Sequence, residues 1–212
     1  MPYIVGIVLG AGRSSRMGKP KLELALEGKP LGLYAFDAAV RSQFTHVLFV
    51  GSDESPPVWL ENRNGETDGK WSYLYCPNAQ EGFGESLKCG VKRAIEFGAD
   101  AIMIILADQP FQTAYLFNSH LKLYQKTEPN YLASTYQSIP MPPIIFSKSM
   151  YPKLLALQGD AGARSLLKSE SGLFNELYDS ILAFDIDNES EYLTAKLLMQ
   201  SRIRRREDKW TY

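Results

Sequence analysis

An apolar run near the start of the chain, Ile4-Val5-Gly6-Ile7-Val8-Leu9, opens directly into a polar loop, Gly10-Ala11-Gly12-Arg13-Ser14-Ser15-Arg16-Met17-Gly18-Lys19-Pro20-Lys21. The run predicts a short buried strand. Glycines in the loop let the backbone approach a ligand closely and turn its N–H groups inward, while the arginines and lysines carry positive charge. A strand that ends in such a loop is typical of a polyphosphate-binding site.

Two familiar phosphate-binding motifs nearly match this loop, and both fail. The spacing of Gly10, Gly12 and Ser15 is similar to the dinucleotide fingerprint. That fingerprint must run straight into a helix, but Gly18 and Pro20 stand where the helix would continue, and a proline costs a helix interior about 3 kcal/mol. A Walker A loop would be one residue shorter and would have Ser or Thr in place of Pro20.

Apolar, β-branched runs recur along the chain and predict the strands of a layered sheet. The clearest is Ala101–Ala107, whose continuous hydrophobicity fits a strand covered on both faces. The predicted fold class is α/β, a Rossmann-like three-layer sandwich with a mostly parallel sheet and a site at the carboxyl ends of the strands. The other expected strands are 3–9, His46–Gly51, Trp71–Tyr75, Tyr131–Tyr136, Pro143–Phe146 and Ile181–Ile186, and expected helices are 31–41, 87–97 and 115–124.

Length and composition favour one cytoplasmic domain. The chain has 212 residues and a net charge of −1, so we expect a single domain over 1–212, with a polar tail at about 202–212, and no nucleic-acid partner. No leader pattern and no apolar run of membrane-spanning length is present, so we expect no membrane contact. His46 and His120 make no metal-ligand spacing. Cys76 and Cys89 make no CxxC pair, and we expect two buried free thiols in a reducing cytosol.

Five motifs, in the expected order, resemble those of nucleotidyltransferases with a GT-A-like α/β fold. The opening loop is similar to the first of them, approximately Leu-Ala-(Ala/Gly)-Gly-x-(Ser/Gly)-x-Arg-Met-Gly with a Lys shortly after. The other four are Asn78-Ala79-Gln80-Glu81-Gly82-Phe83-Gly84-Glu85-Ser86-Leu87, Ala107-Asp108-Gln109-Pro110, Gly159-Asp160-Ala161-Gly162-Ala163-Arg164 and Asp185-Ile186-Asp187-Asn188. On these motifs the chain is identified as a member of the MobA-like NTP transferase family.

Within that family, the last two motifs and Ala11 resemble the molybdenum cofactor cytidylyltransferases and their purine-catabolism relatives, which are accessory to xanthine dehydrogenase. Three places depart from the pattern. Gly10 replaces the usual Ala, the segment 139–143 lacks the usual Gly and His before its Pro, and Asn188-Glu189 replaces Thr-Pro. The resemblance implies Mg²⁺-dependent transfer of CMP from CTP to a molybdopterin-type phosphate, with release of pyrophosphate.

The resemblance also assigns roles to individual residues of the opening loop. Arg16 and Lys21 are expected to bind the triphosphate and to follow its charge onto the leaving pyrophosphate. Together with Asp108 they make the expected catalytic set. For Arg13 and Lys19 two alternatives stay open, contact with the ligand and exposure to solvent, because side chains on one loop cannot all point inward. The expected nucleotide contacts in this loop are Leu9, Gly10, Ala11, Gly12, Arg13 and Gly18.

Two carboxylates are the expected metal ligands. Asp108 directly follows the most hydrophobic strand, where it can hold Mg²⁺ beside phosphates, although an Asp after a strand can also cap the next helix. Asp187 is the expected second ligand. Asp187 can instead cap a helix that begins near Ser190. If the match of the motif to this sequence is shifted by two residues, Asp185 takes the place of Asp187 as the metal ligand.

Two further segments are implied to contact the substrates. Glu81, Gly82, Gly84 and Ser86 are expected at the base and ribose, and Ser86 alone can also be read as the cap of the helix 87–97. Asp160 and Arg164 are implied to line the acceptor side, with Arg164 holding a phosphate. Their spacing also fits an ion pair between side chains four residues apart on a helix.

Two other functions stay open at this point. The same fold and loop would serve a nucleotidyltransferase that uses GTP or acts on a sugar or polyol phosphate. A non-catalytic carrier of a pterin cofactor would need no triphosphate machinery, so Arg16, Lys21 and Asp108 argue against it. The expected partners are CTP, a phosphate-bearing acceptor such as molybdopterin, and a molybdenum hydroxylase of the xanthine dehydrogenase type.

Overall fold

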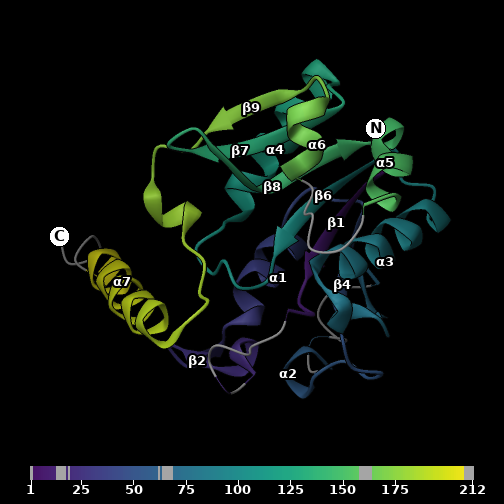
Figure 1. Ribbon diagram of the computed structural model, residues 1–212. Coiled ribbons are helices and arrows are strands. Elements are labelled where there is room, and N and C mark those ends of the chain that lie inside the picture. Colours follow the sequence, from purple (N-terminus) through teal and green to yellow (C-terminus); the bar gives the residue numbers. More distant parts are fainter. Residues whose placement is uncertain are drawn as a thin grey trace.

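The computed structural model describes residues 2–12, 18, 20–61, 63, 69–157 and 164–207. A seven-stranded sheet forms the middle of the molecule, with helices on both faces (Figure 1). The strands run in the order β5-β4-β1-β6-β8-β7-β9, and only β8 is antiparallel to its neighbours. Their bounds are β1 Ile4–Leu9, β4 His46–Gly51, β5 Trp71–Tyr75, β6 Ala101–Leu106, β7 Tyr131–Tyr136, β8 Ile139–Ser147 and β9 Leu173–Glu176. The predicted three-layer α/β fold is confirmed.

Successive side chains of each strand point to opposite faces of the sheet, and this builds two apolar layers. On β1, Ile4 and Val8 face one layer, while Val5 and Ile7 face the other. The first layer is covered by α1 (Gly32–Val40) and α4 (Ala114–Thr127), and the second by α3 (Phe83–Glu96), α5 (Tyr151–Leu155) and α6 (Arg164–Ser169). Burial on both sides explains why the central strands are apolar throughout rather than alternating with polar residues.

Smaller elements lie beside the sheet. The hairpin β2 (Ala25–Leu26) and β3 (Lys29–Pro30) packs against the long helix α7 (Glu189–Glu207), which lies to one side of the sheet in Figure 1. The remaining elements are α2 (Val58–Glu61) and the 3-10 turns η1 (Lys21–Glu23), η2 (Ala79–Glu81), η3 (Lys148–Met150) and η4 (Ser180–Ala183). The helix α7 includes residues 202–207 of the expected tail. Among the helices of the described ranges, none has both the length and the apolar character of a membrane span.

Two expectations are wrong. The run Ile181–Ile186 is not a strand: it begins as η4, because the Asp179 carboxylate accepts a hydrogen bond from the Ile181 N–H at 3.1 Å and starts a tight turn. Its apolar side chains pack with α7 and Phe111 instead of joining the sheet. The two cysteines are not free thiols, since Cys76 after β5 and Cys89 on α3 are joined in a disulfide with Cα atoms 6.0 Å apart.

A fully buried histidine ties α4 to the sheet. The Nδ1 atom of His120 lies 3.0 Å from the Leu116 carbonyl oxygen, which can only accept, so Nδ1 carries the proton. The Nε2 atom is then an acceptor 2.8 Å from the Ser134 hydroxyl on β7, and the Pro143 carbonyl oxygen, 3.2 Å from the same hydroxyl, competes for its proton. Burial lowers the pKa of His120, and the hydrogen bond to Leu116 only partly opposes that shift. The ring is therefore neutral at pH 7.

This histidine should make the fold sensitive to acid. Because its pKa is lower in the folded than in the unfolded chain, where it is about 6.5, the unfolded state takes up the proton first and the free energy of unfolding falls as pH drops below 6.5. His120→Gln, which removes the titrating group, is expected to flatten this slope. Urea unfolding at several pH values between 5 and 7 measures it. If the free energy of unfolding falls equally with pH in the wild type and in His120→Gln, His120 is not the group that causes the acid sensitivity.

Candidate active site

A pocket of about 480 Å³ lies at the carboxyl ends of β1 and β6. These two strands pair in parallel, with Leu9 opposite Leu106. The chain order reverses at this point, because β4 and β5 extend the sheet on one side of β1 and β6 extends it on the other. Such a switch point opens a crevice in which α/β sheets bind ligands. The lining residues are Leu9, Gly10, Ala11, Gly12, Lys21, Leu22, Ala79, Gly82, Phe83, Ser86, Leu106, Asp108 and Asp187.

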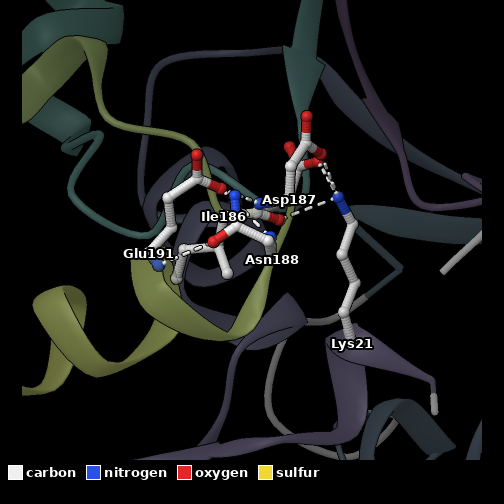
Figure 2. A network of polar contacts seen from close by, with 6 residues as sticks. Lys21, Ile186, Asp187, Asn188 and Glu191 are labelled. Atoms are coloured by element: carbon white, nitrogen blue, oxygen red, sulfur yellow. Dashed lines mark hydrogen bonds and ion pairs between the residues drawn. The ribbon is translucent and has the colours of Figure 1, made fainter. Parts of the chain in front are cut away.

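A buried lysine connects three distant segments in this pocket. The Lys21 ammonium group donates to Asp108 Oδ2 at 2.6 Å, to Asp187 Oδ1 at 2.9 Å and to the Ile186 carbonyl at 2.9 Å (Figure 2). The Lys21 side chain is 9% exposed, compared with 19% for Asp108 and 43% for Asp187. The structure therefore brings together three of the residues that the sequence analysis assigned to catalysis and metal binding.

The two carboxylates keep Lys21 charged. Burial alone would lower the pKa of Lys21, but the attraction and hydrogen bonds of Asp108, with those of Asp187, outweigh burial and raise it. A charged ammonium thus occupies the space between the two carboxylates. This is the position that another cation would take if Lys21 moved toward a negatively charged ligand.

The capping alternative for Asp187 is excluded by its neighbours. The Asn188 side-chain oxygen accepts from the Glu191 N–H at 3.0 Å, and the Glu191 carboxylate accepts in return from the Asn188 N–H at 3.0 Å. This reciprocal arrangement is a capping box at the start of α7. Glu191 also accepts from the Asp187 N–H at 2.6 Å, which holds the backbone while the Asp187 side chain points to Lys21 (Figure 2). Asn188, one of the departures from the family pattern, thus supplies the cap.

Asp185 does not take part in the pocket. It is exposed and does not belong to the lining, whereas Asp187 does. Although the residue is exposed overall, desolvation of its carboxyl group and the negative charges of Asp108 and Asp187 raise the pKa of Asp185. Burial is the larger cause of this shift, and the two carboxylates of the pocket add to it.

The chemistry of the pocket fits a divalent metal bound beside phosphates. Asp108 Oδ1 is buried and has no hydrogen-bond partner among the described residues, so one carboxylate oxygen is left for a ligand. No group of three or more His, Cys, Asp or Glu side chains in the described ranges is arranged to hold a metal by protein atoms alone. Mg²⁺ commonly takes one or two carboxylates and completes its shell with phosphates and water, which matches Asp108 and Asp187.

The backbone of the opening loop forms one wall. Gly10, Ala11 and Gly12 line the pocket, and the Gly10 N–H continues the β1 ladder by donating to the Val50 carbonyl at 2.9 Å. A Cβ atom on Gly10 would lie 2.3 Å from the Phe49 ring, which is packed in the core. The Phe49 ring therefore takes the space that the usual Ala of the motif would need, and this explains the departure at position 10.

Gly10→Ala is accordingly expected to destabilise the protein. Overpacking of this kind costs about 1–3 kcal/mol, and the free energy of unfolding should fall by that amount. Shortening the clashing ring in the double variant Gly10→Ala/Phe49→Leu should recover part of the loss, so the two changes will not be additive. Urea unfolding of the four proteins in this cycle measures the coupling. Strict additivity would show that the methyl group and the ring do not meet.

The second motif supplies the opposite wall. Gly82 has φ 138°, a conformation that favours glycine, and it turns the chain from η2 into α3. Gly82 and Ser86 line the pocket, whereas Glu81 and Gly84 do not belong to the lining. Ser86 lies within α3, which begins at Phe83, so its interpretation as a helix cap is wrong. It is 4% exposed, and its position in the wall favours the role in ligand binding.

Comparison with known proteins agrees with these motifs. A family model described as the MobA-like NTP transferase domain matches residues 6–174. The chain belongs to this family. It is also 37% identical over 197 residues to the purine catabolism protein PucB of Bacillus subtilis (strain 168), a match that covers 90% of this chain and 95% of PucB.

Solved structures share the fold of this MobA-like transferase. The manganese complex of Rv0371C from Mycobacterium tuberculosis H37Rv superposes with a TM-score of 0.68 at 22% identity, covering 91% of this chain and 97% of that one. Molybdopterin-guanine dinucleotide biosynthesis protein A from Archaeoglobus fulgidus gives a TM-score of 0.70 at 18% identity, covering 93% and 99%. At these identities the likeness concerns the fold.

Several expected site residues of this MobA-like transferase lie outside the described residues or the pocket. Arg13, Arg16 and Asp160 belong to segments that the structure does not describe, as does Lys19. Arg164 begins α6, but its side chain is not among those described. Gly18 has φ 63° and does not belong to the lining.

Four apolar residues of the lining were not predicted. Ala79 and Phe83 belong to the second motif, Leu106 ends β6, and Leu22 follows Lys21. Leu22 and Phe83 are each adjacent in sequence to a predicted site residue, while Ala79 and Leu106 each stand two positions before one. Nearness in sequence to a motif residue could therefore have predicted these four lining residues.

Proposed function

We propose that this protein is a Mg²⁺-dependent cytidylyltransferase that transfers CMP from CTP to a molybdopterin-type phosphate. A phosphate oxygen of the acceptor attacks the α-phosphorus, the bond from that phosphorus to the bridging oxygen breaks, and pyrophosphate leaves. The observation that carries the proposal is the buried Lys21 between Asp108 and Asp187, in a pocket walled by both glycine-containing loops. The family supports nucleotidyl transfer, and Ala11 favours cytidine over guanosine.

The acceptor is proposed from two likenesses. PucB takes part in purine catabolism by its name, which fits a partner of the xanthine dehydrogenase type, and the Archaeoglobus protein is named for molybdopterin dinucleotide synthesis. A molybdenum hydroxylase that receives the finished dinucleotide cofactor is therefore the proposed protein partner. Asp160 and Arg164 stay proposed as residues on the acceptor side.

The residues of the chain would share the work as follows. Asp108 and Asp187 would hold the metal, which when bound neutralises phosphate charge and orients the α-phosphate. Lys21, released from the carboxylates, would donate to the triphosphate and stabilise charge as it develops on the leaving pyrophosphate. Arg13 and Arg16 are proposed to do the same from the opening loop. Gly82 and Ser86, with Glu81 and Gly84 of the same motif, would hold the base and ribose.

Thermal unfolding with CTP, GTP, ATP and UTP, each with and without Mg²⁺, tests the nucleotide half of this proposal. A ligand that binds only the folded state raises its stability with the logarithm of the ligand excess. We expect a metal-dependent increase in Tm with CTP that exceeds those with the other three. A preference for GTP or ATP would contradict the cytidine assignment. No shift with any triphosphate would overturn the enzyme proposal in favour of a pterin carrier.

A further inference from the structure

A second pocket, of about 290 Å³, lies further along the same sheet. It is formed where β7 and β8 extend beyond the last residue of β6 that pairs with β8, and where β9 forms the edge of the sheet. Its lining residues are Thr135, Ser138, Pro140, Phe174 and Glu176. A volume just below the range of about 300–1,000 Å³ that is usual for drug-sized ligands suits a small ring system rather than a whole nucleotide.

The walls of this pocket combine an aromatic face with a fixed carboxylate. Phe174 is 50% exposed although it is a large apolar side chain. The Glu176 carboxylate accepts hydrogen bonds from the Thr135 hydroxyl and, at 2.8 Å, from the Gln137 N–H. Each carboxylate oxygen can accept more than one hydrogen bond, so Glu176 keeps capacity for a ligand while its position is set by β7 and the β7–β8 turn.

The pocket opens on the same edge of the sheet as the active site. From β6, which ends two residues before Asp108, three strand-to-strand steps lead through β8 and β7 to β9, a distance of roughly 14 Å at about 4.8 Å per step. The segment after β9 joins the two places, since the Leu177 N–H donates to the Thr135 carbonyl at 2.7 Å and the Ile186 N–H to the Asp108 carbonyl at 3.1 Å. Figure 1 shows this segment running from β9 toward α7. An acceptor can therefore place its phosphate at Asp108 while its far end reaches β9.

We propose that this second pocket binds the ring of the acceptor, and that the ring is a pterin held by Phe174 and Glu176. This inference rests on the proposed function for the direction of the acceptor. A pterin carries an exocyclic amino group beside a ring N–H, so it presents two parallel donors. A carboxylate accepts such a pair in the bidentate manner in which it accepts from Arg. The flat ring would stack on Phe174, as bases do on aromatic side chains.

The same walls disfavour the other acceptors. A sugar or polyol phosphate has no flat ring to stack on Phe174 and no pair of parallel N–H donors to match the Glu176 carboxylate. Glu176 is thus the proposed specificity-determining residue for the acceptor.

Calorimetric titration with hydroxymethylpterin and hydroxymethyllumazine tests the inference. Lumazine has a carbonyl oxygen where pterin has the amino group, so it would face the Glu176 carboxylate with an acceptor. We expect the wild-type protein to bind the pterin roughly tenfold or more tightly than the lumazine. Glu176→Gln, which preserves the size of the side chain, should remove this preference. Phe174→Ala should weaken both ligands, and Tyr178→Ala, an exposed aromatic change outside the lining, should weaken neither.

The outcomes separate this inference from the proposed function. Absence of saturable pterin binding by the wild-type protein, or an unchanged pterin preference in Glu176→Gln, overturns the pterin pocket whatever the nucleotide results are. If the preference depends on Glu176 but CTP and molybdopterin yield no pyrophosphate, the pocket stands and the proposed reaction falls. Circular dichroism and unchanged CTP binding in Glu176→Gln exclude unfolding as the cause of a lost preference.

Discussion

Asp108→Asn is expected to lower the rate of pyrophosphate release by roughly a thousandfold, a size typical for the loss of a group that stabilises charge in the transition state. The change keeps the shape of the side chain but removes the negative charge that pairs with Lys21 and the buried oxygen that has no partner among the described residues. Lys21 retains Asp187 and the Ile186 carbonyl, so the fold should lose little stability. Steady-state turnover and Tm measure the two effects.

Asp185→Asn is the matched control for this change. It removes a carboxylate from the same end of the pocket but from a side chain that does not belong to the lining. Its turnover should stay within a few-fold of wild type, because its influence on Asp108 and Asp187 acts only through charge. Near-normal turnover of Asp108→Asn in the presence of metal would show that the metal and catalytic assignments are wrong. Equal losses in both variants would mean that general charge, and not Asp108 itself, matters.

Lys21→Met is expected to abolish measurable transfer and to destabilise the protein in the absence of ligands. Breaking a buried ion pair by removing one partner costs about 3–5 kcal/mol, and the partial exposure of Asp187 reduces the expected loss here to about 1–3 kcal/mol. The two carboxylates then repel each other without a cation between them. Mg²⁺ should therefore raise the Tm of this variant more than it raises that of the wild type.

Lys29→Met provides the comparison for Lys21→Met. Lys29 pairs with Asp37 at 2.6 Å, the same distance as Lys21 with Asp108, but outside the pocket. This variant should keep its turnover, and Mg²⁺ should not stabilise it beyond the wild type. An equal metal response of Lys21→Met and wild type in thermal unfolding would contradict the view that the ammonium occupies a cation site.

The fold was largely predictable because burial on both faces leaves a clear mark in sequence. β1, β4, β5, β6 and β7 were all predicted as strands within one residue of their bounds. The glycine loop and the two aspartates were assigned to one site because few residue types meet the chemical needs of phosphate and metal binding. The structure places them in one pocket, and their roles in binding stay predictions. Lys21 pairs with Asp187, which is 166 residues away in the sequence, and also with Asp108, and only the fold shows this arrangement.

The errors arise where local pattern and tertiary packing disagree. The run Ile181–Ile186 has the apolar content of a strand, but a side-chain cap at Asp179 and the apolar face of α7 decide its conformation. The edge strand β9 was missed because it has only four residues, of which Leu173 and Phe174 are partly exposed. The pairing of Cys76 with Cys89 depends on how α3 packs beside β5, which their separation in sequence does not reveal.

The reaction itself tests the central claim most directly. The protein would be incubated with CTP, Mg²⁺ and molybdopterin, and pyrophosphate and the cytidine dinucleotide would be measured together, with GTP in a parallel reaction. We predict that both products form in equal amounts from CTP and that omission of molybdopterin stops pyrophosphate release. Absence of pyrophosphate from the complete CTP reaction, or formation of a dinucleotide from GTP alone, would contradict the cytidylyltransferase account.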